Sequence, residues 1–304
     1  MIAALVLYAL TAAQVVAHNP VQRDQMVVSP AWLAAHLSDK QLVVIHVGMG
    51  DADLYKAEHI AGAQYIKMEE FAAPGGDATI GRLNLELPPD ADLAATLARH
   101  GITPASTVVL YFGKNEVSEA TRVILTLDHA GLGAHAALLQ GGFPAWKRGG
   151  YPTTAEVRSV TPAAVMSLTP KRVTVDAAVL QNSAGKPGVA IVDARDQAAY
   201  DGISGGMGRA AGHIPGAVSL YYRSLYNEAN ELRPAAELAA AFAKAGVKPG
   251  DTVMAYCWLG QFATATLFAA RSLGYEVLLY DGSIEDWTAR HLPLEATRKG
   301  GGSR

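Results

Sequence analysis

The chain has 304 residues, of which half are hydrophobic and 17% are charged, and its formal net charge at pH 7 is -3. This length is enough for two ordinary domains, and the composition is typical of a folded globular protein. A small negative charge without a dense cluster of lysine and arginine gives no electrostatic reason to expect a nucleic-acid partner. The single cysteine excludes an internal disulfide, and without a Cys/His array at zinc spacing we expect no metal site.

The chain begins with an uncharged apolar run over residues 2–17, which ends in small residues before His18. This run resembles the apolar region and cleavage site of a secretory signal, and it is shorter than the ~20 residues that a membrane span needs. We therefore expect residues 1–17 to be a signal peptide and the mature protein to be periplasmic or secreted, without stable membrane insertion. Because no lysine or arginine precedes the run, the alternative is a cytoplasmic protein in which it is an ordinary helix.

The next elements alternate between strands and helices. Residues 27–28 predict a short strand, and Ser29-Pro30 predicts the cap and first turn of a helix. The continuous apolar run at 42–47 predicts a strand buried on both faces. Further helices are expected at 93–100 and from about Glu119, and further strands at 107–111 and 136–139. The alternation predicts an α/β fold with a parallel sheet flanked by helices on both faces.

The second half of the chain repeats the first half in the same order. Four segments correspond: 190–195 with the strand end at 44–48, 212–217 with 58–63, 245–253 with 100–108, and 281–287 with 140–146. Four ordered correspondences indicate a duplicated domain. We expect a first domain at 27–153, a polar linker at 154–173 that contains Pro162 and Pro170, and a second domain at 174–297.

Cys257 lies where a buried strand, a short loop and a helix follow one another, over residues 253–270. This order places its sulfur at the carboxyl end of a strand and above a helix N-terminus, where backbone N–H groups and the helix dipole stabilise negative charge. Ligands of open parallel sheets bind at this edge. We therefore expect a reactive thiol that ionises more easily than a free one. The alternative is that Cys257 is only a small core hydrophobe.

The two halves differ at the positions that would carry chemistry. Phe112 stands opposite Cys257, and His46-Val47-Gly48 stands opposite Asp193-Ala194-Arg195. The first half therefore lacks the thiol, the acid and the guanidinium together, which predicts that Cys257 and Arg195 act together. The residues that both halves keep are expected to be structural: His59 and His213 bonded to backbone, Trp146 and Trp287 packed in the core.

Together these motifs resemble the rhodanese family of sulfurtransferases in its tandem form, over about residues 27–294. Gly212-His213-Ile214-Pro215-Gly216-Ala217 is similar to the family signature Gly/Ala-His-Ile-Pro-Gly-Ala, and the segment from Asp281 to Trp287 is similar to its closing Gly-x-x-x-x-Trp motif. The resemblance implies two rhodanese-like domains, of which the N-terminal one is inactive and the C-terminal one carries the catalytic cysteine. It also implies a covalent cysteine persulfide without a cofactor, a small anionic sulfur donor, and a thiol or cyanide acceptor.

The expected reaction starts with attack of the Cys257 thiolate on the outer sulfur of thiosulfate or 3-mercaptopyruvate. Arg195 is expected to bind the anionic end of the donor as a planar fork, and Asp193 to orient Arg195 or a loop N–H group from behind. The loop backbone is expected to bind the persulfide through Trp258, Leu259, Gly260, Gln261, Phe262 and Ala263. Trp258 and Leu259 stand where family members that act on thiosulfate carry basic residues and those that act on mercaptopyruvate carry Gly and Ser. The loop therefore leaves the donor open.

Two other functions are consistent with a cysteine at this place. One is a persulfide carrier or sulfur-binding module that loads sulfur without turnover. The other is a cysteine phosphatase, which the sequence disfavours because such an enzyme needs an arginine six positions after the cysteine, where this chain has Ala263. Turnover with free thiosulfate distinguishes the enzyme from the carrier.

Overall fold

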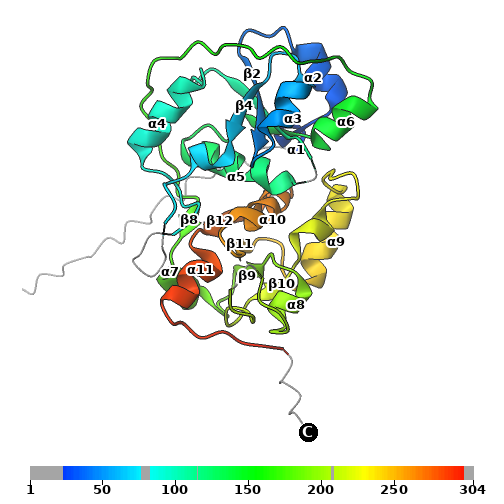
Figure 1. Cartoon of the computed structure of the whole chain (residues 1–304). Helices are drawn as coiled ribbons and strands as arrows, with labels where there is room; N and C mark the ends of the chain where they lie inside the picture. The colour runs from blue at the N-terminus through cyan, green and yellow to red at the C-terminus, as the bar shows by residue number, and fades with distance from the viewer. Residues whose placement is uncertain (1–22, 77–82, 115, 207–208, 298–304) are drawn as a thin grey trace, which may run out of the picture.

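The structure is a computed structural model that describes residues 23–76, 83–114, 116–206 and 209–297. Each half of the chain builds one five-stranded sheet, and the two domains lie one above the other in Figure 1. The strand orders are β1-β6-β5-β2-β4 and β10-β9-β11-β12-β8, and all pairs within these two sheets are parallel. This confirms the predicted α/β fold with two tandem domains. The predicted signal peptide at 1–17 lies outside the described residues.

The first domain contains the elements that the alternating pattern predicted. Its strands are β1 (Val27–Val28), β2 (Leu42–Gly48), β3 (His59–Ile60), β4 (Gln64–Lys67), β5 (Thr107–Phe112), β6 (Ala136–Leu139) and β7 (Thr153–Thr154). Its helices are α1 (Arg23–Met26), α2 (Pro30–His36), α3 (Ala52–Ala57), the 3-10 helix η1 (Met68–Phe71), α4 (Asp90–Arg99), α5 (Val117–His129) and α6 (Gly142–Arg148). The predicted cap is confirmed, because Ser29 Oγ accepts a hydrogen bond from Trp32 N at 3.1 Å.

The second domain repeats this arrangement. Its strands are β8 (Thr174–Val175), β9 (Val189–Asp193), β10 (Val218–Ser219), β11 (Thr252–Tyr256) and β12 (Glu276–Tyr280). Its helices are α7 (Ala177–Ser183), α8 (Gln197–Tyr200), the 3-10 helix η3 (Tyr222–Leu225), α9 (Ala235–Lys244), α10 (Gln261–Arg271) and α11 (Ser283–Ala289). Between β7 and β8, residues 155–173 form neither helix nor strand and hydrogen-bond to the first domain through Ala163 N and Lys171 N.

Helices α5 and α10 pack against each other between the two sheets (Figure 1). Each of them follows the strand at the equivalent place in its domain, β5 or β11. Thr121 Oγ1 and Thr264 Oγ1 lie 2.8 Å apart across this contact, and the main hydrophobic cluster runs through both domains. The loop that contains Cys257 immediately precedes α10, so the first domain forms part of the surroundings of the second domain's loop.

The residues kept in both halves are structural, as predicted. The Nδ1 atoms of His59 and His213 lie 2.6 and 2.8 Å from the carbonyl oxygens of Tyr55 and Tyr200. The two equivalent indoles, Trp146 and Trp287, are buried and donate to the carbonyl oxygens of Pro152 and Pro293.

Candidate active site

Cys257 is the first residue after β11, as the sequence predicted, and it is fully buried. Its backbone N–H donates to Ser283 Oγ at 3.1 Å, and its carbonyl oxygen accepts from Ile284 N at 3.2 Å. Gly260 turns the loop into α10 with φ of +79°, and a Cβ atom there would lie 2.7 Å from the carbonyl oxygen of Asp281. A side chain at this position would therefore clash with backbone as well as strain the turn. These contacts fix the loop against the start of α11.

The loop backbone surrounds the Cys257 sulfur. Burial raises the pKa of the Cys257 thiol, while hydrogen bonds from the backbone N–H groups of Ala263, Leu259, Phe262 and Gly260 act in the opposite direction. The expectation that this thiol ionises more easily than a free one is therefore wrong for this structure, because the loss of solvation outweighs the N–H donors. The donors themselves were predicted, and they are arranged to stabilise an anion on the sulfur.

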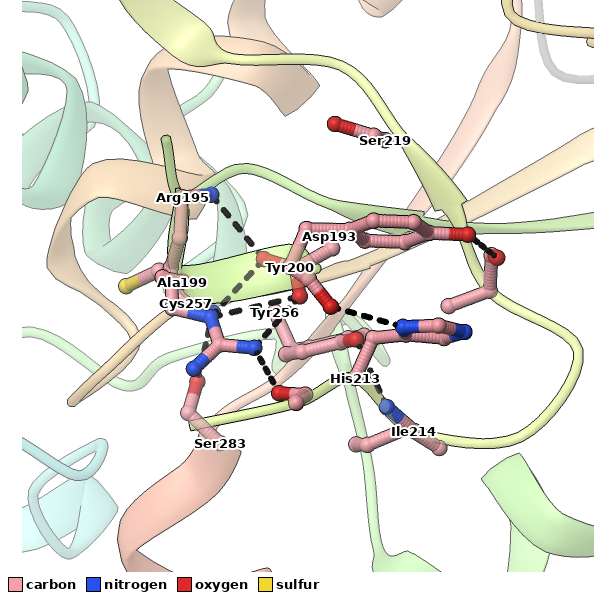
Figure 2. A network of polar contacts seen from close by, with 12 residues as sticks. Asp193, Arg195, Ala199, Tyr200, His213, Ile214, Ser219, Tyr256, Cys257 and Ser283 are labelled. Carbon is pink, nitrogen blue, oxygen red and sulfur yellow. Dashed lines mark hydrogen bonds and ion pairs between the residues drawn. The ribbon is translucent and has the colours of Figure 1, made fainter. Parts of the chain in front are cut away.

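Asp193 and Arg195 form a buried ion pair behind the loop (Figure 2). Asp193 Oδ2 lies 2.6 Å from Arg195 Nη2, and Asp193 Oδ1 accepts from both Arg195 N and Arg195 Nε, at 3.0 and 2.9 Å. Arg195 Nη2 also donates to the carbonyl oxygen of Gly212 at 2.6 Å. Burial works against the charged guanidinium, but Asp193 holds the pKa of Arg195 above its ordinary value. Asp193 thus orients Arg195.

The Trp258 ring packs on the Arg195 guanidinium. The guanidinium carbon of Arg195 is 4.4 Å from the centroid of the Trp258 ring, a cation–π geometry, and both side chains are buried. Gly206 packs against the same indole, where a Cβ atom would lie 2.7 Å from Trp258 Cζ2. Arg195 Nη1 is buried without a hydrogen-bond partner. The structure therefore shows the Arg195 guanidinium packed against the Trp258 ring of the loop, and its direct contact with a donor stays a prediction.

The arginines around the loop are paired with carboxylates. Arg122 of α5 is buried against Asp281, Arg209 pairs with Glu285 at 3.2 Å, and Arg223 pairs with Glu116 at 2.8 Å. The Arg122 guanidinium also approaches the catalytic loop, because a Cβ atom at Gly260 would lie 3.3 Å from its Nη1. Arg122 and Glu116 of the first domain were not predicted from the sequence, because no local pattern relates them to a loop of the other domain. The acidic Glu116 directly before α5 was the available signal.

Two negative observations apply to the described residues. No group of three or more His, Cys, Asp or Glu side chains among them is placed to hold a metal ion. None of the helices described is both long enough and apolar enough to cross a membrane.

Comparison with known proteins agrees with this architecture. A family model described as "Rhodanese-like domain" matches residues 29–149 and again residues 176–290. The chain is 33% identical over 264 residues to the "Probable 3-mercaptopyruvate sulfurtransferase" of Pseudomonas aeruginosa, covering 84% of this chain and 92% of that protein. It is 28% identical over 265 residues to the "Thiosulfate sulfurtransferase" of the same organism, with coverages of 86% and 93%.

A solved structure that is similar to this chain has the same fold. The crystal structure of YnjE superposes with a TM-score of 0.81 at 24% identity, covering 92% of this chain and 70% of that one. The resemblance read from the motifs is therefore confirmed by two family matches and by relatives aligned over most of the chain. The chain belongs to the rhodanese family of sulfurtransferases, in its tandem form.

Proposed function

We propose that the second domain transfers sulfur through a persulfide on Cys257 and that the first domain has no chemistry of its own. The observation that carries this proposal is the ring of backbone N–H groups from Leu259, Gly260, Phe262 and Ala263 around the only thiol. Such a ring stabilises negative charge on the bound sulfur without a cofactor. The equivalent place in the first domain is taken by Phe112.

The transfer has two steps. The Cys257 thiolate attacks the outer sulfur of the donor, the bond from that sulfur to the rest of the donor breaks, and the electron pair leaves with sulfite or with the pyruvate carbanion, which then takes a proton. An acceptor thiolate or cyanide attacks the outer persulfide sulfur, and Cys257 leaves as a thiolate. The thiolate must form inside a buried site, so the N–H ring offsets the cost of desolvation in both steps.

We propose thiosulfate or 3-mercaptopyruvate as donor, because relatives that align over most of the chain carry these names. The loop favours neither of them: its side chains are Trp258, Leu259 and Phe262, and the three arginines around it are matched by carboxylates. Cys257 is closed off from solvent, so a donor reaches the sulfur only when a loop side chain moves.

Intact-mass measurement after mixing the protein with each donor separately tests the proposal. We expect a mass gain of one sulfur atom on Cys257 with at least one donor, loss of this gain on addition of cyanide or a thiol, and no gain in Cys257→Ser. Repeated turnover supports an enzyme. One round of loading without turnover would instead support a carrier, and sulfur transfer by Cys257→Ser would refute the mechanism.

We also propose that the protein is exported to the periplasm or outside the cell. The only support for this proposal is the uncharged apolar run at residues 2–17. N-terminal sequencing of the protein from its native host tests this. A mature start near His18 supports export, and an intact Met1 or Ile2 contradicts it.

A further inference from the structure

Glu116 of the first domain accepts hydrogen bonds from residues of both domains. It immediately precedes α5, and its Oε1 accepts from Ser118 N and Ser118 Oγ at 3.1 and 2.6 Å. Its Oε2 accepts from Tyr222 OH and Arg223 Nη2 of the second domain at 3.0 and 2.8 Å. One carboxylate thus satisfies four donors, two from each domain.

From Glu116, two series of contacts, called arms below, lead to the loop around Cys257. One runs through Ser118 and the other through Tyr222. On one arm, Ser118 Oγ accepts a hydrogen bond from Gln261 Nε2 at 3.0 Å, in the first turn of α10. On the other arm, the ring of Tyr222 stacks on that of Phe262, with centroids 4.9 Å apart and planes within 4°. Gln261 and Phe262 are neighbours in the chain, so the contacts close a ring through Glu116.

This ring acts on the groups that face the sulfur. Phe262 and the adjacent Ala263 supply two of the N–H groups that hydrogen-bond to the Cys257 sulfur. Their direction depends on how the first turn of α10 is held, because a small rotation of these peptides turns the N–H groups away from Sγ. The side chains of Gln261 and Ser118 are buried, so the bond between them is shielded from water.

We propose that Glu116 is a positioning residue for the active site of the other domain: its carboxylate holds Gln261 and Phe262 so that the loop N–H groups point at Cys257. The first domain then contributes to sulfur transfer although it has no thiol. The inference deepens the proposed function, but its first readout, the reactivity of the Cys257 thiol, does not require any sulfur donor.

The test compares two variants of first-domain carboxylates. Glu116→Gln keeps the shape of the side chain but presents an NH₂ group to one of the two sets of donors. Asp128→Asn is the matched control, since Asp128 also bridges the domains, to Arg271 at 3.2 Å, but lies at the far end of α5. Both variants weaken an interdomain carboxylate contact, and only the first touches the loop.

The first measurement is the pH profile of Cys257 alkylation by iodoacetamide in the whole chain. We expect Glu116→Gln to shift the profile to higher pH and Asp128→Asn to leave it at the wild-type position. In stopped-flow mixing with a donor, Glu116→Gln should slow persulfide formation about tenfold at saturating donor, with little change in KM.

A second variant keeps the proposal testable if Glu116→Gln folds poorly. Tyr222→Phe removes one donor to Glu116 and retains the ring on Phe262, so we expect a smaller shift in the same direction. Equal alkylation profiles for Glu116→Gln and Asp128→Asn, or a change in KM alone, would overturn the proposal. A shifted profile in a protein that accepts sulfur from neither donor would support the positioning role while refuting the proposed function.

Discussion

His46 occupies in the first sheet the position that Asp193 occupies in the second. His46 is the register partner of Tyr111 on β5, and Asp193 is the register partner of Tyr256 on β11. Both tyrosine hydroxyls accept a hydrogen bond from the backbone N–H of an isoleucine in the repeated signature, Ile60 or Ile214. The strand pairing and the tyrosine contacts around the two positions are thus the same.

The polar partners at the two positions differ. Asp193 binds Arg195, whereas His46 Nε2 lies 3.2 Å from Asp51 Oδ2. A Cβ atom at Gly48, the position equivalent to Arg195, would lie 1.9 Å from Asp51 Oδ1. The Asp51 carboxylate therefore fills the space in which an arginine side chain would begin, so the packing of the first domain differs from that of the second by more than the missing cysteine.

This difference in packing predicts that a cysteine alone does not give activity to the first domain. Phe112 fills the place of the thiol, and a Cβ atom at the neighbouring Gly142 would lie 2.7 Å from its ring. We expect Phe112→Cys in a Cys257→Ser background to form no persulfide with either donor and to lose about 2–4 kcal/mol of stability through the cavity. Intact mass and urea denaturation measure the two effects. Sulfur loaded on residue 112 would contradict the prediction.

The Asp193–Arg195 pair should be costly to break. Arg195→Ala leaves the buried Asp193 carboxylate without its cation, and removal of one partner of a buried pair costs about 3–5 kcal/mol. We expect urea titrations to show this loss in the free energy of unfolding. We also expect slower persulfide formation, because Trp258 loses the side chain against which it packs. The double variant Asp193→Asn/Arg195→Ala is the control and should recover part of the stability, since it removes the unpaired charge. A single variant as stable as wild type would show that the pair is not held as the structure shows.

Trp258 should limit access of anions to Arg195. Arg195 Nη1 is buried without a hydrogen-bond partner, and the guanidinium carbon lies 4.4 Å from the centroid of the Trp258 ring. We expect Trp258→Gly to expose the guanidinium and to lower KM for thiosulfate several-fold, about 1 kcal/mol of a charge-assisted contact, with discharge of the persulfide to cyanide unchanged. Trp258→Phe, which keeps an aromatic cover, is the control. A KM that stays constant or rises in the glycine variant would argue that Arg195 has no part in donor binding.

Glu119 should make stability fall with rising pH. Burial, with Asp51 and Glu116 as neighbouring acids, raises the pKa of this half-buried carboxyl to about 8 from an ordinary value of 4.5. The folded state therefore binds the proton more tightly than the unfolded state, and this stabilisation is fully present below pH 4.5 and is lost as pH rises towards 8.

Glu119→Gln removes this pH dependence. After allowance for partial exposure, we expect the variant to be about 1–2 kcal/mol more stable than wild type at pH 8.5 and equal to it near pH 4.5. Urea denaturation at several pH values measures the difference. A variant less stable than wild type at pH 8.5 would contradict the assigned pKa.

The α/β class, the duplication, the place of Cys257 and the structural roles of His59 and His213 could all be predicted from the amino-acid sequence. These features depend on local patterns: apolar runs of strand length, a loop between strand and helix, and motifs that recur in order. The comparison of the two halves left two roles open for Asp193, and the hydrogen bonds to Arg195 support the first of them.

The electrostatics of the site could not be predicted in this way, because they depend on the three-dimensional packing. The depth of Cys257 raises its pKa although the predicted N–H donors are present, and desolvation depends on everything packed around the thiol rather than on its neighbours in sequence. The contact between Trp258 and Arg195, and the hydrogen bond from Gln261 to Ser118 across 143 positions, join segments that no local pattern connects. Long-range packing therefore determines which first-domain residues lie against the second domain's site, Glu116 and Ser118 among them.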